Sequence, residues 1–448
     1  MIPVVTPDEA RALDAASPVP LDVLVERAGA AVAREALELL GGAYGRRVVV
    51  LAGKGHNGDD GRVAARLLER RGARVEVVDA LRSPARLPRC DLVVDAAFGT
   101  GFRGTWAAPS TDAPVLAVDV PSGVDGLTGE AAPGVLRADR TVTFAALKPG
   151  LLLGRGAELA GDVVVADIGL DGAGAARAWL VEAADVRAWL PSRRRDAHKW
   201  QAATWIVAGS PGMNGAALLA TRGAQRSGAS YVRLSVPGAG PAAPVPMAPP
   251  EAVQWALPTS GWAAEVLAGC DRIRSLVVGP GLGRAGDADV RALLAGLALP
   301  VVVDGDGLTA LAPLDHPLAA GAVLTPHDGE LARLTGGPPG PDRLDQARRL
   351  ASRAGCTVLL KGPVTAVADP DGSVLLSATG DARLATAGTG DVLAGIIGGL
   401  LAQGVAPARA AAAGAWLHGE AGAAGRVRGL LAGDLPDFLP SVFERLER

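Results

Sequence analysis

The sequence predicts an α/β protein made of two three-layer αβα domains, each a parallel sheet between helices. The chain has 448 residues, and a single hydrophobic core rarely extends beyond roughly 300 residues. Short apolar runs bounded by glycine alternate with helical patterns, which is typical of buried parallel strands and the helices that cover them. A glycine-rich break at residues 169–174 (GLDGAG) interrupts this alternation, so we place the domains at residues 1–174 and 178–448.

The first half is expected to begin with helices and to continue with strands. Thr6 can cap a helix, Pro7 suits its first position and Glu9 can reach back to the cap amide. A second helical pattern covers residues 21–40 and ends at Gly41-Gly42. Strands are expected at residues 47–52, 74–78, 91–95, 115–120 and 141–144, with a helix at 62–70.

The second half repeats the alternation. Strands are expected at residues 204–208, 232–236, 275–278, 300–303, 322–324 and 357–360. Residues 237–250 are rich in proline and alanine and should form an irregular surface loop. A last long apolar helix should begin at residues 388–391 (GTGD).

Composition excludes several classes of protein. The net charge is only −3, so nucleic acid and acidic membranes are not expected as partners. Three scattered cysteines, Cys90, Cys270 and Cys356, indicate a reducing compartment without a disulfide framework or zinc cluster. Neither a signal-peptide core nor an apolar run of membrane-spanning length is found. We therefore expect a cytoplasmic protein that does not span a membrane, and we expect a homo-oligomer.

Residues 53–61 (GKGHNGDDG) form a glycine-rich loop between a buried strand and a helix. The loop satisfies GxGxxG and Asp79 follows at the spacing of a dinucleotide fingerprint, so an ordinary dehydrogenase is one alternative. However, Asp59 and Asp60 would crowd the helix N-terminus, where a pyrophosphate needs bare amides. These carboxylates suit a cation or a hydroxylated ligand better. A tight turn with capping aspartates is the structural alternative.

Two further loops follow the next two buried strands, at residues 95–102 (DAAFGTGF) and 119–125 (DVPSGVD). Loops at the carboxyl ends of neighbouring parallel strands converge on one crevice. Together they supply Asn57, Asp95 and Ser122 as oxygen donors for a hard monovalent cation. Asp119 is a candidate base, and Lys148 is its candidate cationic partner.

On these motifs, residues 1–174 resemble the NAD(P)H-hydrate epimerase family, whose domain is Rossmann-like. The family usually reads NNGGDG where this chain has residues 56–61 (HNGDDG), so His56 and Asp59 depart from it. The resemblance implies a K⁺ site at Asn57, Asp95 and Ser122, and a catalytic role for Asp119 and Lys148. It also implies that the dinucleotide contacts His56, Asn57, Gly58, Asp59, Asp60, Gly99, Thr100, Gly101, Phe102, Arg103, Gly104 and Thr105.

In the second half, residues 386–391 (TAGTGD) open an apolar helix. The free amides at its positive end would form an anion hole for a transferring phosphoryl group. Asp391 lies beside this hole and could take a proton from an attacking hydroxyl. A structural N-cap, the alternative, does not need glycine on both sides.

Other second-half loops follow strands and should lie on the same rim. They are residues 279–283 (GPGLG), 325–330 (TPHDGE) and 361–365 (KGPVT). His327 could be a structural loop residue, but its place on the rim of Asp391 favours a functional role. Asp304 and Asp306 could hold Mg²⁺ through water or could only cap a helix, and the sequence does not separate these alternatives.

These motifs, with His198-Lys199, Gly215-Ala216 and His418-Gly419, make residues 178–448 similar to the ribokinase-like superfamily and its ADP-dependent NAD(P)H-hydrate dehydratases. Trp200 departs from the family, which usually has glycine there. The resemblance implies that Ala216, Gly281, His327 and Asp391 contact the hydrate. It implies that Lys361, Gly362, Pro363, Val364, Thr365 and Gly390 hold the adenylate, with ADP bound as its Mg²⁺ complex.

The two resemblances together imply a bifunctional enzyme of nicotinamide nucleotide repair. One half would interconvert the R and S hydrates of NADH and NADPH, as an isomerase. The other would dehydrate the S hydrate at the expense of ADP, as a lyase. One alternative is a small-alcohol or thiazole kinase with an accessory Rossmann-like domain. Another is that the N-terminal half is a ligand-binding or dimerising module without catalytic activity.

Overall fold

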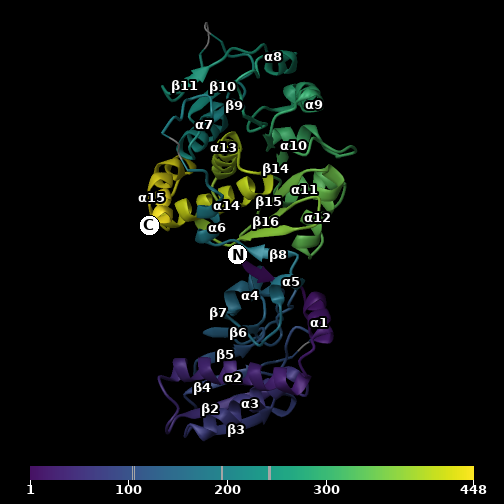
Figure 1. The fold of residues 1–448 in the computed structure, drawn as a ribbon, viewed down its shortest axis with the longest axis vertical. Coiled ribbons are helices and arrows are strands. Elements are labelled where there is room, and N and C mark those ends of the chain that lie inside the picture. The colour runs from purple at the N-terminus through teal and green to yellow at the C-terminus, as the bar shows by residue number, and fades with distance from the viewer. Residues whose placement is uncertain (103, 105, 193–194, 241–243) are drawn as a thin grey trace. The chain divides into compact units, whose positions relative to one another are not determined.

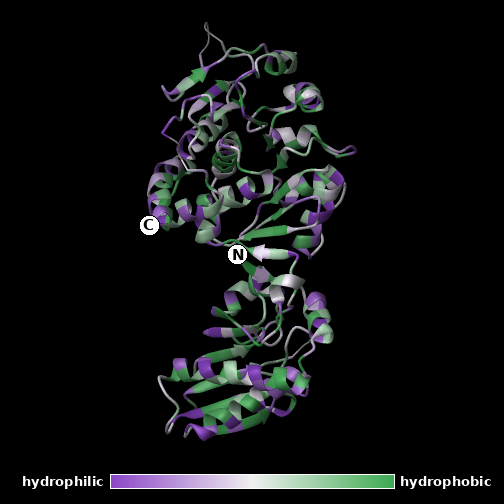
Figure 2. Ribbon diagram, viewed as in Figure 1, coloured by the Kyte–Doolittle hydropathy of each residue, from purple (hydrophilic) through white to green (hydrophobic). Residues whose placement is uncertain are grey.

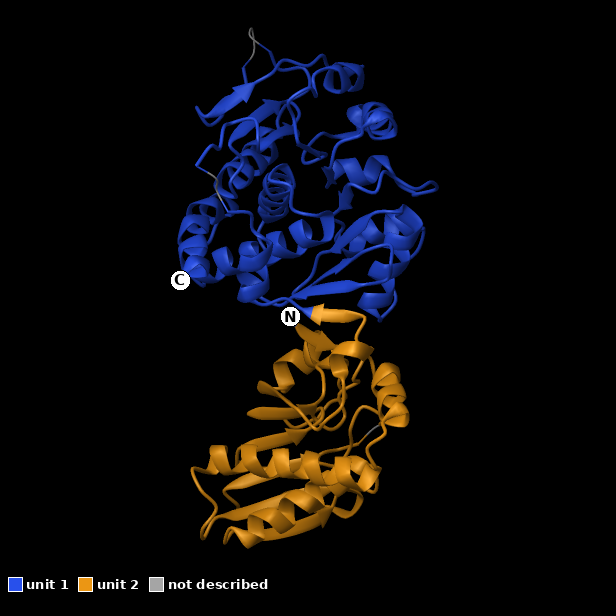
Figure 3. Cartoon of the chain, in the orientation of Figure 1, with its two compact units in different colours: residues 1, 180–448 blue, residues 2–179 orange. Residues whose placement is uncertain are grey.

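The computed structural model describes residues 1–102, 104, 106–192, 195–240 and 244–448. It divides the chain into two compact units, Ile2–Trp179 and Leu180–Arg448 with Met1 (Figure 3). The short strand β8 (Ala178–Leu180) contains the boundary between them. Both units are α/β structures with predominantly parallel sheets, which confirms the predicted fold class.

The N-terminal unit contains a parallel sheet with the strand order β3-β2-β4-β5-β6-β7 (Figure 1). The strands of this sheet are β2 (Arg47–Ala52), β3 (Arg74–Asp79), β4 (Leu92–Ala96), β5 (Val115–Val118), β6 (Arg140–Phe144) and β7 (Asp162–Ala166). The short strand β1 (Ile2–Val4) does not belong to it. Its α-helices are α1 (Pro7–Ala16), α2 (Leu21–Leu40), α3 (His56–Arg70), α4 (Gly154–Leu159) and α5 (Gly172–Ala175). The predicted strands of this half are all present, whereas β1 and β7 were not predicted.

Alternate residues of each central strand pack against opposite faces of this sheet. Val48 and Val50 join an apolar cluster with α2 and α3. Val49 and Leu51 point to the other face, into a cluster that contains Ala80 and Trp106 from the connecting segments. This two-sided burial explains why the strands are apolar runs rather than alternating ones.

The N-termini of α1 and α3 differ in how well the sequence predicts them. The predicted capping box of α1 is present: Glu9 N donates to Thr6 Oγ1 (3.2 Å) and Thr6 N donates to Glu9 Oε2 (2.7 Å). The predicted start of the next helix at residue 62 is wrong, because α3 already begins at His56. Its first turn packs against backbone, since a Cβ on Gly58 would lie 2.1 Å from Gly53 O. Asp59 and Asp60 therefore belong to a helix rather than to a loop.

The C-terminal unit has the strand order β17-β16-β15-β14-β13-β12-β9-β10-β11, parallel except where β16 pairs with β15 and β17. Its strands are β9 (Ala203–Val207), β10 (Tyr231–Ser235), β11 (Ala252–Gln254), β12 (Ser275–Val278), β13 (Val301–Val303), β14 (Ala322–Leu324), β15 (Thr357–Leu360), β16 (Thr365–Ala368) and β17 (Val374–Ser377). Its α-helices are α6 (Ala183–Trp189), α7 (Asn214–Arg226), α8 (Trp262–Ala268), α9 (Asp287–Gly296), α10 (Asp306–Ala310), α11 (Asp328–Thr335), α12 (Arg343–Ala354), α13 (Thr389–Ala402), α14 (Pro407–Ala424) and α15 (Leu435–Glu447). The sequence predicted the central strands but not β11, β16 and β17.

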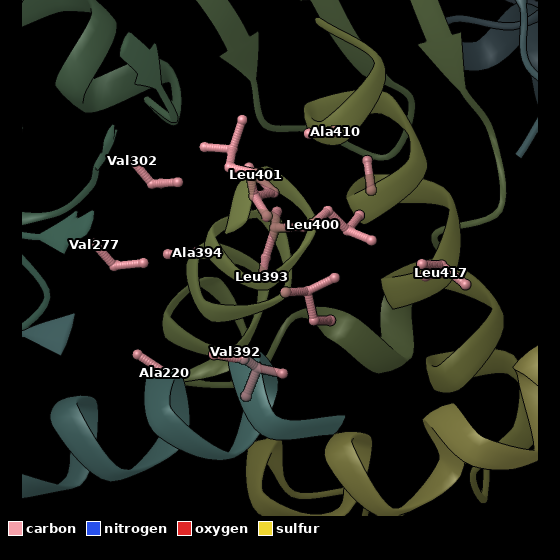
Figure 4. Packing of buried hydrophobic residues seen from close by; sticks show 14 of the residues in the cluster. Ala220, Val277, Val302, Val392, Leu393, Ala394, Leu400, Leu401, Ala410 and Leu417 are labelled. Carbon is pink, nitrogen blue, oxygen red and sulfur yellow. The ribbon is translucent and has the colours of Figure 1, made fainter. Parts of the chain in front are cut away.

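Helix α13 lies in the middle of this unit's core. Figure 4 shows its side chains between Ala220 of α7, Val277 and Val302 of the sheet, and Leu417 of α14. Glycines allow the close approach, because a Cβ on Gly395 would lie 2.0 Å from Ala220 O. The helix is buried on all sides and is therefore hydrophobic on all of them. Figure 2 shows hydrophobic residues along helices and strands of both units. This packing fixes the N-terminus of α13.

Candidate active sites

The N-terminal unit holds a cavity of about 570 Å³ at the carboxyl ends of β2, β4, β5 and β6. Its lining includes the predicted residues His56, Asn57, Asp60, Gly99, Thr100, Gly101, Phe102, Asp119 and Lys148. Gly104 is described but is absent from this lining, while Arg103 and Thr105 lie outside the described residues. These loops converge, as predicted, because they follow the carboxyl ends of neighbouring parallel strands.

Asp119 and Lys148 form an ion pair inside this cavity. Lys148 Nζ lies 2.9 Å from Asp119 Oδ1, and the lysine side chain is only 5% exposed. Lys148 also donates to Thr143 Oγ1 (2.8 Å) and Phe144 O (3.0 Å). Asp119 has a φ of 67°, a conformation that a residue other than glycine adopts at a cost of about 1–2 kcal/mol. The tertiary structure thus holds this carboxylate in a strained, fixed position.

Asp95 and Ser122 contact each other, and neither is part of the cavity lining. Ser122 Oγ donates to Asp95 Oδ1 (2.6 Å) and Ser122 N donates to Asp95 Oδ2 (2.9 Å). Asp95 is completely buried, and burial raises the pKa of its carboxyl although hydrogen bonds from Ser122 and Ala97 oppose the rise. No cationic side chain among the described residues offsets this charge. A buried carboxylate without a counter-ion fits a bound monovalent cation.

Asn57 lies next to the loop that follows β4. A Cβ on Gly99 would be 3.5 Å from Asn57 Oδ1 and 3.1 Å from Asp119 Oδ2, so glycine allows these side chains to approach the loop. Asn57 Nδ2 is buried and has no hydrogen-bond partner within the part of the chain that the structure describes. A buried amide nitrogen needs an acceptor, which a water molecule or a bound ligand can supply.

The two aspartates of α3 have different environments. Asp59 pairs with Arg62 (3.0 Å) and lines a separate groove between α2 and α3, and Gly58 packs on Gly53. Asp60 is buried and faces the cavity. Burial, and next the negative charge of Asp119, raise the pKa of the Asp60 carboxyl to about 8. Asp60 is therefore largely protonated at neutral pH and can donate a hydrogen bond.

Asp14 was not predicted as a site residue. It lies on α1, lines the same cavity and interacts electrostatically with Lys148, Asp119 and His56. The capping motif predicted that α1 exists but not where it packs.

In the C-terminal unit, the N-terminus of α13 presents free amides beside a carboxylate. Gly388 precedes the helix with a φ of 93°, and a Cβ there would lie 2.5 Å from Leu219 Cδ1. Thr389 Oγ1 donates to Leu384 O (2.9 Å) and Thr386 O (3.0 Å), which closes the turn. The amides of Gly390 and Asp391 make no hydrogen bond within the described residues. Free amides at a helix N-terminus are the kind of group that binds anions.

Lys361 lies among several carboxylates at this point. It ion-pairs with Asp304 (2.5 Å), and the charges of Asp304, Glu330 and Asp391 raise its pKa against the effect of burial. Lys361 Nζ would be 3.3 Å from a Cβ on Gly390, so the lysine reaches the helix N-terminus. Burial, and then repulsion by Asp304, raise the pKa of Asp391 to about 6. An aspartate with this pKa can accept a proton near neutral pH.

Asp304 and Asp306 both accept hydrogen bonds in the structure. Asp304 accepts from Lys361 and from Thr325 Oγ1 (2.8 Å). Asp306 Oδ2 accepts from Gly283 N (2.8 Å) and so holds the loop after β12. No group of three or more possible metal-binding side chains occurs among the residues that the structure describes.

The other predicted residues of this half lie around the same rim. Ala216 and Gly281 are neighbours, since a Cβ on Gly281 would lie 2.9 Å from Ala216 Cβ. His327 caps α11, and its Nδ1 accepts from Gly329 N (3.0 Å), so the neutral ring carries its proton on Nε2. That side chain is 55% exposed and available to a ligand.

The residues expected to hold the adenylate form the turn after β15. Lys361 begins this turn, and Gly362, Pro363, Val364 and Thr365 lead into β16. Arg343 Nη2 donates to Lys361 O (2.6 Å) and supports the turn. Arg343 was not predicted, since 18 residues separate it from Lys361.

Two further family motifs, His198-Lys199 and His418-Gly419, lie in different parts of this unit. His418 is buried, burial lowers its pKa to about 4, and its ring lies close to the backbone of Thr389. It therefore supports the first turn of α13. His198 and Lys199 precede β9 and so lie at the amino end of the sheet, away from the catalytic rim.

Fold and sites together define a class of protein. It is an enzyme with two α/β units, one with a buried aspartate–lysine ion pair in a cavity and one with free amides and a carboxylate at a helix N-terminus. None of the helices in the described parts is long and apolar enough to cross a membrane.

Comparison with known proteins identifies the family. Residues 21–87 and 78–150 match the YjeF-related protein N-terminus, and residues 204–439 match NAD(P)H-hydrate dehydratase. The bifunctional NAD(P)H-hydrate repair enzyme Nnr of Moorella thermoacetica is 39% identical over 96% of this chain and 93% of its own length. The enzyme of the same name from Mycobacterium tuberculosis is 42% identical over 85% of this chain and 84% of its own. The chain belongs to the family of bifunctional NAD(P)H-hydrate repair enzymes, which confirms the resemblance found in both halves.

Solved structures agree for the C-terminal unit. The ADP/ATP-dependent NAD(P)H-hydrate dehydratase from Bacillus subtilis, co-crystallised with ATP and Mg²⁺, is 33% identical and covers 58% of this chain and 96% of its own, with a TM-score of 0.50. A ribokinase-like superfamily protein from Enterococcus faecalis has a TM-score of 0.55 at 24% identity, over 60% of this chain and 96% of its own. The ribokinase-like fold predicted for this unit is therefore confirmed.

Proposed function

We propose that this chain repairs hydrated NADH and NADPH in two steps, and that each unit performs one of them. Residues 1–174 interconvert the R and S hydrates at C6 of the nicotinamide ring. Residues 178–448 dehydrate the S hydrate at the expense of ADP and restore the reduced cofactor. We place this activity in the cytoplasm and in a homo-oligomer. Family membership over nearly the whole chain supports both activities.

For dehydration, the observation that carries the proposal is Asp391 beside the free amides of α13. The carboxylate accepts the proton of the substrate hydroxyl while the amides and Lys361 stabilise the transferring phosphoryl group. Phosphate is a far better leaving group than hydroxide, so its elimination completes the dehydration. Ala216, Gly281 and His327 line the hydrate side of this rim, and the turn at residues 361–365 with Gly390 holds the adenylate. Because Asp304 and Asp306 are already engaged, Mg²⁺ would be held chiefly by the ADP phosphates.

For epimerisation, the buried Asp119–Lys148 pair supplies a base and an acid at one point of the cavity. The fixed φ of Asp119 and its partners keep the carboxylate aimed at the bound ring. The uncompensated charge of Asp95 supports a K⁺ site formed with Asn57 and Ser122. There K⁺ would neutralise the buried carboxylate and fix the loop after β4.

One incubation tests both activities. The protein is mixed with the R and S hydrates and ADP, and the return of reduced-nicotinamide absorbance is followed to completion. Recovery of both epimers is the expected result, whereas recovery of the S form alone would exclude an active epimerase. A stable phosphate ester as the product would instead support the alternative of a small-alcohol or thiazole kinase. The structure does not favour that alternative through any specific contact.

A further inference from the structure

Helix α1 forms part of the wall of the N-terminal cavity. Ala10, Leu13 and Asp14 of this helix line it, and residues 10 and 14 are one turn apart on the same face. Ala10 and Leu13 make this face apolar, and Asp14 places a carboxyl group within it. Arg11 also lines the cavity, but its guanidinium pairs with Asp8. Asp14 is an exposed residue, so its carboxyl group is open to a ligand in the cavity.

Charged groups from the other cavity walls face Asp14. Lys148 from the loop after β6 attracts it, Asp119 from the end of β5 repels it, and His56 at the start of α3 attracts it. Asp60 and Lys54 line the same cavity, and Asp60 interacts electrostatically with Asp14. Partial desolvation at the cavity wall outweighs these effects and raises the pKa of Asp14, although the residue is exposed. The carboxyl group is thus close to the acid–base pair but belongs to a different wall.

The proposed reaction needs proton transfer on both faces of the substrate ring. The carbon to be inverted carries a hydroxyl group and the ring nitrogen. When the C–O bond breaks, the oxygen leaves with the bonding electrons and a proton from a carboxyl group, as water. The nitrogen lone pair stabilises the resulting cation. Water then adds to the opposite face, and the carboxylate there accepts its proton, so that water is neither gained nor lost and no redox step occurs.

Resting on the proposed epimerase function, we propose that Asp14 is a second catalytic proton-transfer group, which acts on the ring from α1 while Asp119 acts from the end of β5. The two carboxyl groups exchange the roles of acid and base between the forward and reverse reactions. Since the Asp119–Lys148 pair serves one face, Asp14 supplies the group that the other face requires. The N-terminal helix is therefore part of the active site rather than a cover for it.

The test uses the full chain and pure R hydrate without ADP, so that the dehydratase is idle, and measures formation of the S hydrate by chromatography. We expect Asp14→Asn to lower kcat by about 100-fold, with little change in KM. Asp14→Glu should recover part of the rate, with an altered pH profile. In water labelled with heavy oxygen, each inversion by the wild-type enzyme should introduce one solvent oxygen.

Asp8→Asn is the matched control, because Asp8 lies on the same helix with its side chain 82% exposed. It should keep the wild-type rate. Asp14→Asn is nearly isosteric, and an unchanged melting curve will show that α1 stays in place. If Asp14→Asn epimerises at the wild-type rate with the same pH profile, or if no solvent oxygen enters, this inference is wrong while the proposed function stands. A wild-type protein that does not epimerise at all would overturn both.

Discussion

Replacement of Asp391 by asparagine should abolish dehydration and at the same time stabilise the C-terminal unit. Burial and repulsion raise the pKa of this carboxyl from 3.8 to about 6. At about 1.4 kcal/mol for each pH unit, the ionised side chain costs the folded state about 3 kcal/mol. The neighbouring carboxylates relax once one of them is neutral, so we expect a gain of about 1–3 kcal/mol. The catalytic carboxylate is thus kept at the expense of stability.

The stability difference between wild type and Asp391→Asn should depend on pH, because the pKa of Asp391 is raised in the folded chain. Below pH 3.8 the carboxyl is protonated in both the folded and the unfolded chain, so wild type and Asp391→Asn should be equally stable. As the pH rises, the unfolded chain ionises first and the wild-type free energy of unfolding falls, until the folded carboxyl also ionises near pH 6. The advantage of the variant should therefore grow between about pH 4 and pH 6 and then stay constant. Wild-type dehydration should also decline below about pH 6.

Denaturant titration followed by tryptophan fluorescence measures the stability of this unit. Of the eight tryptophans in the chain, Trp205 and Trp262 are fully buried in the C-terminal unit. Glu444→Gln, at an exposed position of α15, is the control and should not change the transition. A variant that is less stable than wild type at pH 8, or that still restores reduced-nicotinamide absorbance with ADP, would refute the argument.

Three other predictions follow from the two sites. Gly388→Ala should destabilise the C-terminal unit by about 1–3 kcal/mol, because residue 388 has a φ of 93° and its Cβ would lie 2.5 Å from Leu219. The same denaturant titration measures the effect. Gly404→Ala is the control that separates backbone strain from the clash, because Gly404 has a φ of 85° but open space around it. Lys148→Met should lower epimerisation by about 100-fold while ADP-driven recovery from pure S hydrate stays at the wild-type rate, and an equal loss of both activities would contradict the assignment. Replacement of K⁺ by tetramethylammonium should slow epimerisation alone, and a rate independent of the cation would argue against a K⁺ site at Asp95.

Sequence patterns predicted local features well. The capping box at Thr6 and the free helix N-terminus before Asp391 depend on residues a few positions apart, so their geometry follows from the order of residues. The start of α3 was wrong because glycine disfavours a helix in isolation. In the structure, backbone packing of Gly58 against Gly53 outweighs this preference.

Features that depend on tertiary packing could not be predicted. Lys361 and Asp304 are 57 residues apart, and nothing in either motif indicates that they pair. Asp14 is an ordinary helical aspartate in the sequence, and only the packing of α1 brings it to the cavity. The strands β16 and β17 form an antiparallel extension of the sheet, which the expected alternation of strand and helix does not contain.

The two sites use lysine in opposite ways, and the difference follows from their charges. Lys148 forms an ion pair with Asp119 and otherwise donates to neutral oxygens, so the two charges of this pair balance each other. Lys361 interacts with Asp304, Glu330 and Asp391, which leaves the C-terminal site with an excess of negative charge. Phosphate groups cannot enter such a site unless cations and the α13 dipole offset this charge. Nucleotide should therefore bind there together with a divalent ion. The positive charge of that ion would favour the ionised form of Asp391, which is the form that the transfer needs.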